Sequence, residues 1–190
     1  MKPTASQADA ETQWFGVVVG LGAWTMLFAA LAFTVGYLRM REPWPSEGTL
    51  SLPRLLPALN LLLLVGGSAL MHAALQRLRR APDTRGAALL RYVGGALGLG
   101  AAFLGLQAGL ARTLWEAGLR LPSGGAQASA FYGLMGIHAT HALVGLVGLT
   151  GVAVALHRGK SNTQPLRLWG LYWHFVTCTG WLFYGAVYLP

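Results

Sequence analysis

Five long apolar segments constrain the fold of this chain more than any other feature of its sequence. They run over roughly 14–38, 55–75, 87–111, 128–156 and 168–189, and Arg91 is the one charged residue among them. Each segment reaches the ~20 residues that an α-helix needs to cross ~30 Å of hydrocarbon. Only 11% of the 190 residues are charged, whereas a soluble domain carries about a quarter. The sequence therefore predicts an all-α fold, an integral membrane five-helix transmembrane bundle that forms one domain over residues 1–190.

Basic residues indicate which end of this bundle faces the cytoplasm. Five crossings put the N-terminus and the connections near 76–86 and 157–167 on one side, which carries nine of the 14 Lys and Arg residues. By the positive-inside rule we expect a multi-pass membrane protein with a cytoplasmic N-terminus and an external C-terminus. The first segment is too long for the apolar part of a secretion signal, so we expect it to remain as a span. The net charge of +8 reflects this topology and not nucleic-acid binding, which needs a basic face on a soluble surface.

Six polar side chains within the apolar segments are the candidate interhelical or lipid-cleft residues. They are Asn60, His72, Gln107, His138, His141 and His174. Ionisable side chains are costly in hydrocarbon, so they usually face the interior of a bundle. His138 and His141 lie three residues apart and share a helix face. The depths of His141 and His174 along antiparallel helices differ by only ~5 Å, so their rings could meet.

Three interpretations of this histidine cluster remain open. It could form interhelical hydrogen bonds, typically worth ~0.6 kcal/mol each, it could bind a metal or haem, or it could relay protons. Two axial haem ligands must approach opposite faces of the iron, which His138 and His141 on one helix face cannot do. No apolar segment contains an acidic residue, which disfavours a proton relay and the Glu-x-x-His type of metal pair. The single Cys178 excludes an internal disulfide and a cysteine-based metal cluster.

Glycine pairs at four-residue spacing lie within several of the apolar segments. Small residues let helices approach closely in lipid, so such pairs mark expected contact faces. They are Gly16/Gly20, Gly94/Gly98 and Gly105/Gly109, with Gly145, Gly148 and Gly151 as a close variant.

The last two apolar segments also resemble a known family. Residues 131–148 read FYGLMGIHATHALVGLVG, and residues 170–183 read GLYWHFVTCTGWLF. These are similar to the final two helices of subunit III of haem-copper respiratory oxidases. LPRLLPALNLLLLVGGSALMHA at 52–73 and FLGLQAG at 103–109 resemble earlier helices of that subunit. Thr25, Leu110 and Thr177 stand where the family has carboxylates, so a proton-handling role for those carboxylates does not carry over.

This resemblance implies the short five-helix bacterial form and a subunit without a catalytic centre of its own. Haem and copper would then belong to partner subunits I and II. Subunit III would pack against the catalytic subunit, bind phospholipid, and support proton uptake and stability during aerobic respiration. We expect no catalytic, cofactor-binding or metal-binding residue and no direct small-molecule substrate in this chain. The electron donor, cytochrome c or quinol, and the haem type are set by the partners.

Other classes of protein also remain open. An accessory subunit of a nitric oxide reductase system is a relative that the sequence separates poorly. A small transporter or channel would favour inverted repeats and broken spans, and the sequence shows no internal repeat. A stand-alone quinone- or haem-binding enzyme is the last alternative.

Overall fold

The computed structural model describes residues 5–41, 52–81, 86–159 and 164–188, and these ranges contain five helices and no strand. The helices are α1 (Ala5–Arg41), α2 (Leu55–Arg80), α3 (Gly86–Glu116), α4 (Gly125–His157) and α5 (Gln164–Tyr188). The first four contain stretches that are long and apolar enough to cross a membrane. This confirms the predicted all-α membrane bundle.

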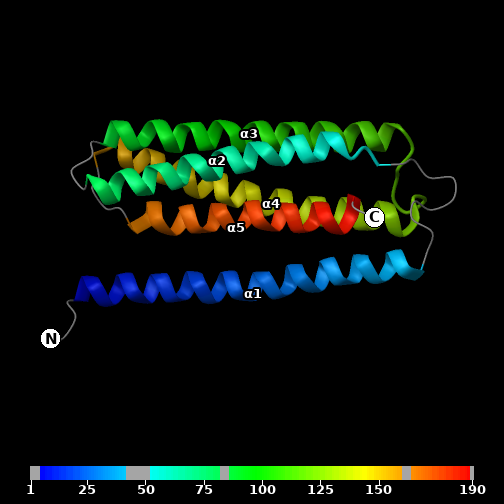
Figure 1. Ribbon diagram of the computed structural model, residues 1–190, viewed down its shortest axis with the longest axis horizontal. Coiled ribbons are helices and arrows are strands. Elements are labelled where there is room, and N and C mark those ends of the chain that lie inside the picture. Colours follow the sequence, from blue (N-terminus) through cyan, green and yellow to red (C-terminus); the bar gives the residue numbers. More distant parts are fainter. Residues whose placement is uncertain (1–4, 42–51, 82–85, 160–163, 189–190) are drawn as a thin grey trace.

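Helix α5 differs from the other four in composition. Its 25 residues give it a length of about 37 Å, which is sufficient to cross hydrocarbon. It contains many Trp, Tyr, Thr and His side chains, which lower its hydropathy, and it does not meet the criterion that the other four meet. That α5 forms a fifth span therefore stays a prediction, supported by its position alongside the other helices (Figure 1).

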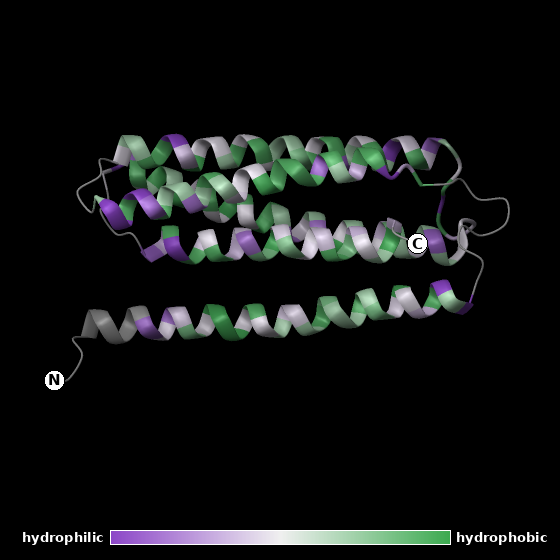
Figure 2. Ribbon diagram, viewed as in Figure 1, coloured by the Kyte–Doolittle hydropathy of each residue, from purple (hydrophilic) through white to green (hydrophobic). Residues whose placement is uncertain are grey.

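Consecutive helices run antiparallel, so the two chain ends lie at opposite ends of the molecule (Figure 1). Helices α2, α3, α4 and α5 form a four-helix bundle in which each helix packs against two neighbours, and α2 and α5 close the ring. Helix α1 lies outside this ring, against α5 and, to a lesser extent, α4. Hydrophilic residues concentrate toward the two ends of the helices (Figure 2). This arrangement agrees with a membrane crossing.

The four-helix bundle is organised around the indole ring of Trp173, which is fully buried. Each of the other three bundle helices presents a glycine to it. A β-carbon on Gly67 of α2 or Gly145 of α4 would come within 2.9 Å of the indole ring. A β-carbon on Gly100 of α3 would lie 2.5 Å from it. A real β-carbon cannot approach that closely. Any larger residue at one of these three positions would therefore force Trp173 to move.

The predicted glycine contact faces are correct in only one place. Gly145 and Gly148 of α4 do pack closely, against Trp173 and Trp169. Elsewhere a β-carbon would meet nothing within 4 Å in the part of the chain that the structure describes. This holds for Gly16, Gly20, Gly94, Gly98, Gly105, Gly109 and Gly151.

Helix α3 shows the physical reason why most of the predicted glycine contact faces were wrong. Its buried face is formed by Leu89, Val93, Ala96, Gly100 and Phe103. These residues recur every three or four positions, as expected of one face of an α-helix. The paired glycines Gly94 and Gly98 lie on a different face of the same helix. Spacing alone therefore did not identify the packed side.

We predict that Gly100→Ala destabilises the bundle by about 1–3 kcal/mol, the usual cost of overpacking, because the new methyl group would overlap Trp173. Gly98→Ala is the matched control, because its β-carbon would lie in open space. Alanine favours a helix over glycine by about 1 kcal/mol, so the control should be neutral or slightly stabilising. Thermal unfolding of the purified chain in detergent, followed by circular dichroism, measures both. Equal midpoints for the two variants would contradict the central position of Trp173.

Candidate functional site

The six polar residues singled out from the sequence do not form one cluster. The structure separates them into an Asn60–Gln107 pair, a His72–His174 pair, and two histidines of α4 with different surroundings. Each group joins a different set of helices.

Asn60 and Gln107 connect α2 to α3. The Asn60 side chain is 6% exposed, and its Nδ2 donates to Gln107 Oε1 at 3.0 Å and to the carbonyl of Phe103 at 3.2 Å. One amide thus satisfies two acceptors on the neighbouring helix. In lipid such hydrogen bonds average ~0.6 kcal/mol and reach ~1.7 kcal/mol. This pair therefore acts as an interhelical tie.

His174 of α5 pairs with α2. Its Nδ1 is hydrogen-bonded to the hydroxyl of Ser68, and its ring centroid lies 6.2 Å from that of His72. The Nε2 of His72 in turn lies 2.8 Å from Nε2 of Gln76, one turn further along α2. A short row of polar side chains therefore lies between α2 and α5.

His141 helps to hold α1 against the bundle. Its ring contacts Trp24 and Phe28 of α1 edge-on, with centroid distances of 4.4 Å and 4.8 Å. Such ring pairs add about 0.5–1.5 kcal/mol beyond the burial of their area. Phe28 is fully buried and also contacts Phe175 and Phe183 of α5. His141 Nδ1 donates to the carbonyl of Ile137 in its own helix at 2.8 Å.

The predicted meeting of the His141 and His174 rings is absent from the contacts of the described residues. His141 faces α1, whereas His174 faces α2. The depth estimate placed the two residues at similar heights in the membrane, but depth does not specify the rotation of a helix about its axis. The histidines of α4 and α5 consequently serve different neighbours.

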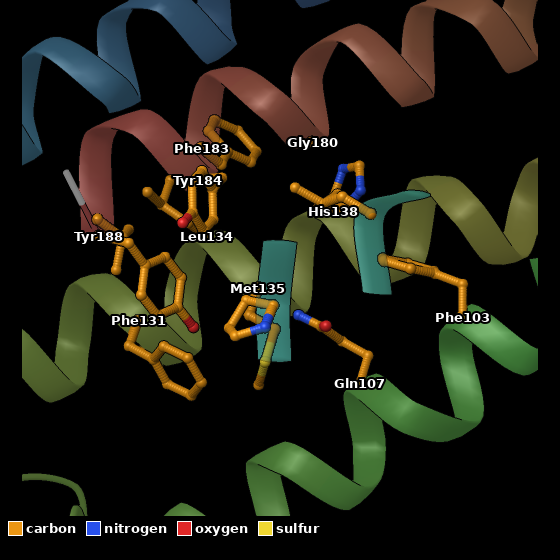
Figure 3. A pocket seen from close by; sticks show the side chains of 13 residues that line it. Phe103, Gln107, Phe131, Leu134, Met135, His138, Gly180, Phe183, Tyr184 and Tyr188 are labelled. Atoms are coloured by element: carbon orange, nitrogen blue, oxygen red, sulfur yellow. The ribbon is translucent and has the colours of Figure 1, made fainter. Parts of the chain in front are cut away.

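His138 is the most buried of the histidines in the described residues. It is 4% exposed, and its ring lies edge-on to Phe103 of α3 and Phe183 of α5, at 5.7 Å and 6.1 Å. It borders a cavity of about 50 Å³, to which Gln107 also contributes. Figure 3 shows these side chains around the cavity.

The three positions where the resembling family carries carboxylates have ordinary structural roles here. Thr177 is buried and donates to the carbonyl of Trp173 at 3.0 Å and to that of Leu64 at 3.4 Å. Thr25 is exposed on α1 and donates to the carbonyl of Leu21. Leu110 packs at the edge of an apolar cluster. None of these side chains can exchange a proton near neutral pH.

Over residues 5–41, 52–81, 86–159 and 164–188, no three His, Cys, Asp or Glu side chains come together in a way that could hold an ion. The polar contacts of the six candidate residues run partly between helices, as for Asn60 and His174, and partly within one helix, as for His141 with Ile137.

A cleft between α1, α2 and α5 contains two of the six candidate residues, His72 and His174, while its other lining residues were not singled out from the sequence. Its volume is about 830 Å³, and it opens beside the N-terminal end of α1. Its lining combines aromatic, aliphatic, basic and histidine side chains: Trp14, Phe15, His72, Leu75, Arg79, Arg167, Leu171 and His174, together with Glu11 and Gln164. The available signal was that Arg79 and Arg167 fall on the same predicted side of the membrane as the start of α1.

Comparison with known proteins shows what this chain is similar to. No family model matches the chain. The chain is similar to the cytochrome c oxidase subunit 3 of Synechocystis sp. (strain ATCC 27184 / PCC 6803 / Kazusa). The two are 29% identical over 193 residues, which cover 94% of this chain and 76% of the Synechocystis protein.

An all-α membrane bundle and a match of this kind are what a membrane subunit of a respiratory complex would show. The match supports the haem-copper oxidase subunit III family, which the motifs in α4 and α5 predicted.

Proposed function

We propose that this chain is the non-catalytic subunit III of a haem-copper terminal oxidase of the bacterial inner membrane. In this role it packs against the catalytic subunit and supports proton uptake and stability during aerobic respiration. One observation supports this non-catalytic role independently of the similarity to a known family. Asn60, His174 and His141 contact neighbouring helices, and no three His, Cys, Asp or Glu side chains of the described residues come together. We propose that haem and copper belong to subunits I and II.

The outer face of α1 suits contact with a partner subunit or with lipid. Phe28 and Val35 are its buried side chains over the described part of the helix. Large apolar side chains along the rest of it are exposed, including Phe15, Met26 and Phe33 at 69%, 77% and 76%. A helix that is apolar all round belongs either in lipid or against other membrane helices. Subunit I is the partner that we propose for part of this face.

The cleft between α1, α2 and α5 suits a phospholipid. Leu75, Leu171 and Phe15 supply an apolar wall for an acyl chain. Arg79 and Arg167 lie beside it at the proposed cytoplasmic end, where two guanidinium groups can bind a phosphate through charge-assisted hydrogen bonds. The single Glu11 in the lining leaves an excess of positive charge. We therefore propose an anionic phospholipid as the occupant.

The proposed function is tested by affinity purification through a tag on this chain, with gentle extraction from native membranes. We expect haem absorbance in the redox difference spectrum, a large multi-span partner rich in histidine, and a copper-binding subunit. Partner subunits of a nitric oxide reductase would instead support the alternative within the same superfamily. A colourless chain that purifies alone and intact would contradict both assignments.

The lipid proposal is tested with the double variant Arg79→Gln/Arg167→Gln in the same tagged complex. We expect native mass spectrometry to show loss of a co-purifying anionic phospholipid, because the phosphate loses both guanidinium partners. The control is Arg112→Gln, whose guanidinium lies on the exposed surface of α3 at the other end of the bundle, paired with Glu116. Equal retention of anionic lipid by the double variant and the control would contradict this site.

A further inference from the structure

Two walls of the cleft between α1, α2 and α5 carry side chains of the same kinds in the same order. From the proposed cytoplasmic end inward, an arginine, a leucine and a histidine follow one another on each wall. They are Arg79, Leu75 and His72 on α2, and Arg167, Leu171 and His174 on α5. Seven residues separate the arginine from the histidine on each helix, which is a rise of about 10 Å. The cleft therefore has a cationic level and, two turns deeper in the membrane, an imidazole level.

Ser68 orients the imidazole of His174. Its hydroxyl is hydrogen-bonded to Nδ1 of His174, so α2 already occupies that nitrogen. The other ring nitrogen, Nε2, makes no hydrogen bond among the described residues. A neutral imidazole has one donor and one acceptor nitrogen. When the hydroxyl donates to Nδ1, the ring proton therefore resides on Nε2, and His174 supplies an N–H donor to the cleft that it lines.

The second histidine of this level is held differently. Nε2 of His72 lies 2.8 Å from Nε2 of Gln76, a residue of its own helix. No hydrogen bond joins the rings of His72 and His174 in the described part of the chain, where their centroids are 6.2 Å apart. Of the two rings, only that of His174 is fixed by a hydrogen bond from another helix.

The two levels of the cleft match the order of groups in a phospholipid. Side chains of an α-helix lean toward its N-terminus. Because α2 and α5 are antiparallel (Figure 1), Arg79 leans toward the imidazole level, and His174 leans toward the arginine level. In a phospholipid the phosphate is followed by the glycerol unit, then by the acyl ester carbonyls, and then by the acyl chains. A phosphate held by the arginines thus directs its ester carbonyls toward His174.

We propose that His174, oriented by Ser68, donates a hydrogen bond from Nε2 to an acyl ester carbonyl of the bound phospholipid. The cleft then selects ester-linked over ether-linked lipid. An ether-linked lipid has a methylene group in place of the carbonyl, so the N–H donor loses its acceptor. This inference rests on the anionic phospholipid proposed above as the occupant. The arginines recognise the charge of the lipid, whereas His174 recognises its linkage, so the two can be tested separately.

The test supplies the tagged native complex, in detergent, with an equimolar mixture of diester and diether phosphatidylglycerol that carry the same chains. Mass spectrometry quantifies the lipid that the complex retains after washing. The fraction bound in the cleft is the part that the double variant Arg79→Gln/Arg167→Gln loses. In that fraction we expect the diester lipid to exceed the diether lipid by about 2–10-fold, which is the effect of one hydrogen bond.

Variants of the imidazole level show whether His174 causes this preference. His174→Phe keeps a ring of similar size but removes the donor, and Ser68→Ala removes the group that positions the donor. We expect both variants to bring the diester-to-diether ratio close to one. A purely structural role of either residue would lower the total amount of lipid and leave the ratio unchanged. The matched control is His141→Phe, which lies outside the cleft lining and keeps an aromatic ring against α1; its ratio should equal that of the wild type.

Two results would overturn this inference and leave the lipid proposal standing. One is a diester-to-diether ratio of one in the cleft fraction of the wild type, and the other is an unchanged ratio in His174→Phe. Equal retention of phosphatidylglycerol by the wild type and by Arg79→Gln/Arg167→Gln would contradict the lipid site itself, and the inference would fail with it.

Discussion

The close approach of the Trp173 indole to Gly67, Gly100 and Gly145 is the contact on which the rest of the bundle depends. One fully buried ring of α5 touches backbone on α2, α3 and α4. In lipid, helices associate through close packing and not through the hydrophobic effect. A large flat ring set against three positions without side chains provides such packing at the centre of four helices. It also sets the rotation of α5 about its axis.

That rotation determines where the polar side chains lie. With Trp173 at the centre, the next residue, His174, turns toward Ser68 and His72 of α2. Helix α1 remains outside the ring, where Phe28 contacts α5 and the ring of His141 in α4. Because α1 is held there, the space near its N-terminal end stays open between α1, α2 and α5. The interhelical contacts and the cleft therefore follow from one packing arrangement.

The sequence alone was sufficient to predict the helices but not to predict which face of each helix is packed against its neighbours. The lengths of the apolar segments predicted the five helices, and the motifs in α4 and α5 pointed to the family that the comparison supports. The glycines that receive Trp173 lie on three separate helices, so no local spacing marks them. The pairs at four-residue spacing were more visible, yet they mostly lie away from helix contacts in the described chain. Residue depth likewise could not show that His141 turns toward α1.

The central proposal is that the histidines in these helices stabilise the contacts between helices and do not bind a redox centre. The redox difference spectrum of the complex that contains His174→Ala, compared with wild type, tests it most directly. The account predicts an unchanged haem spectrum and unchanged haem per catalytic subunit, with less of this chain retained because the tie to Ser68 and His72 is lost. Loss of haem absorbance, with retention of the chain unaltered, would contradict it.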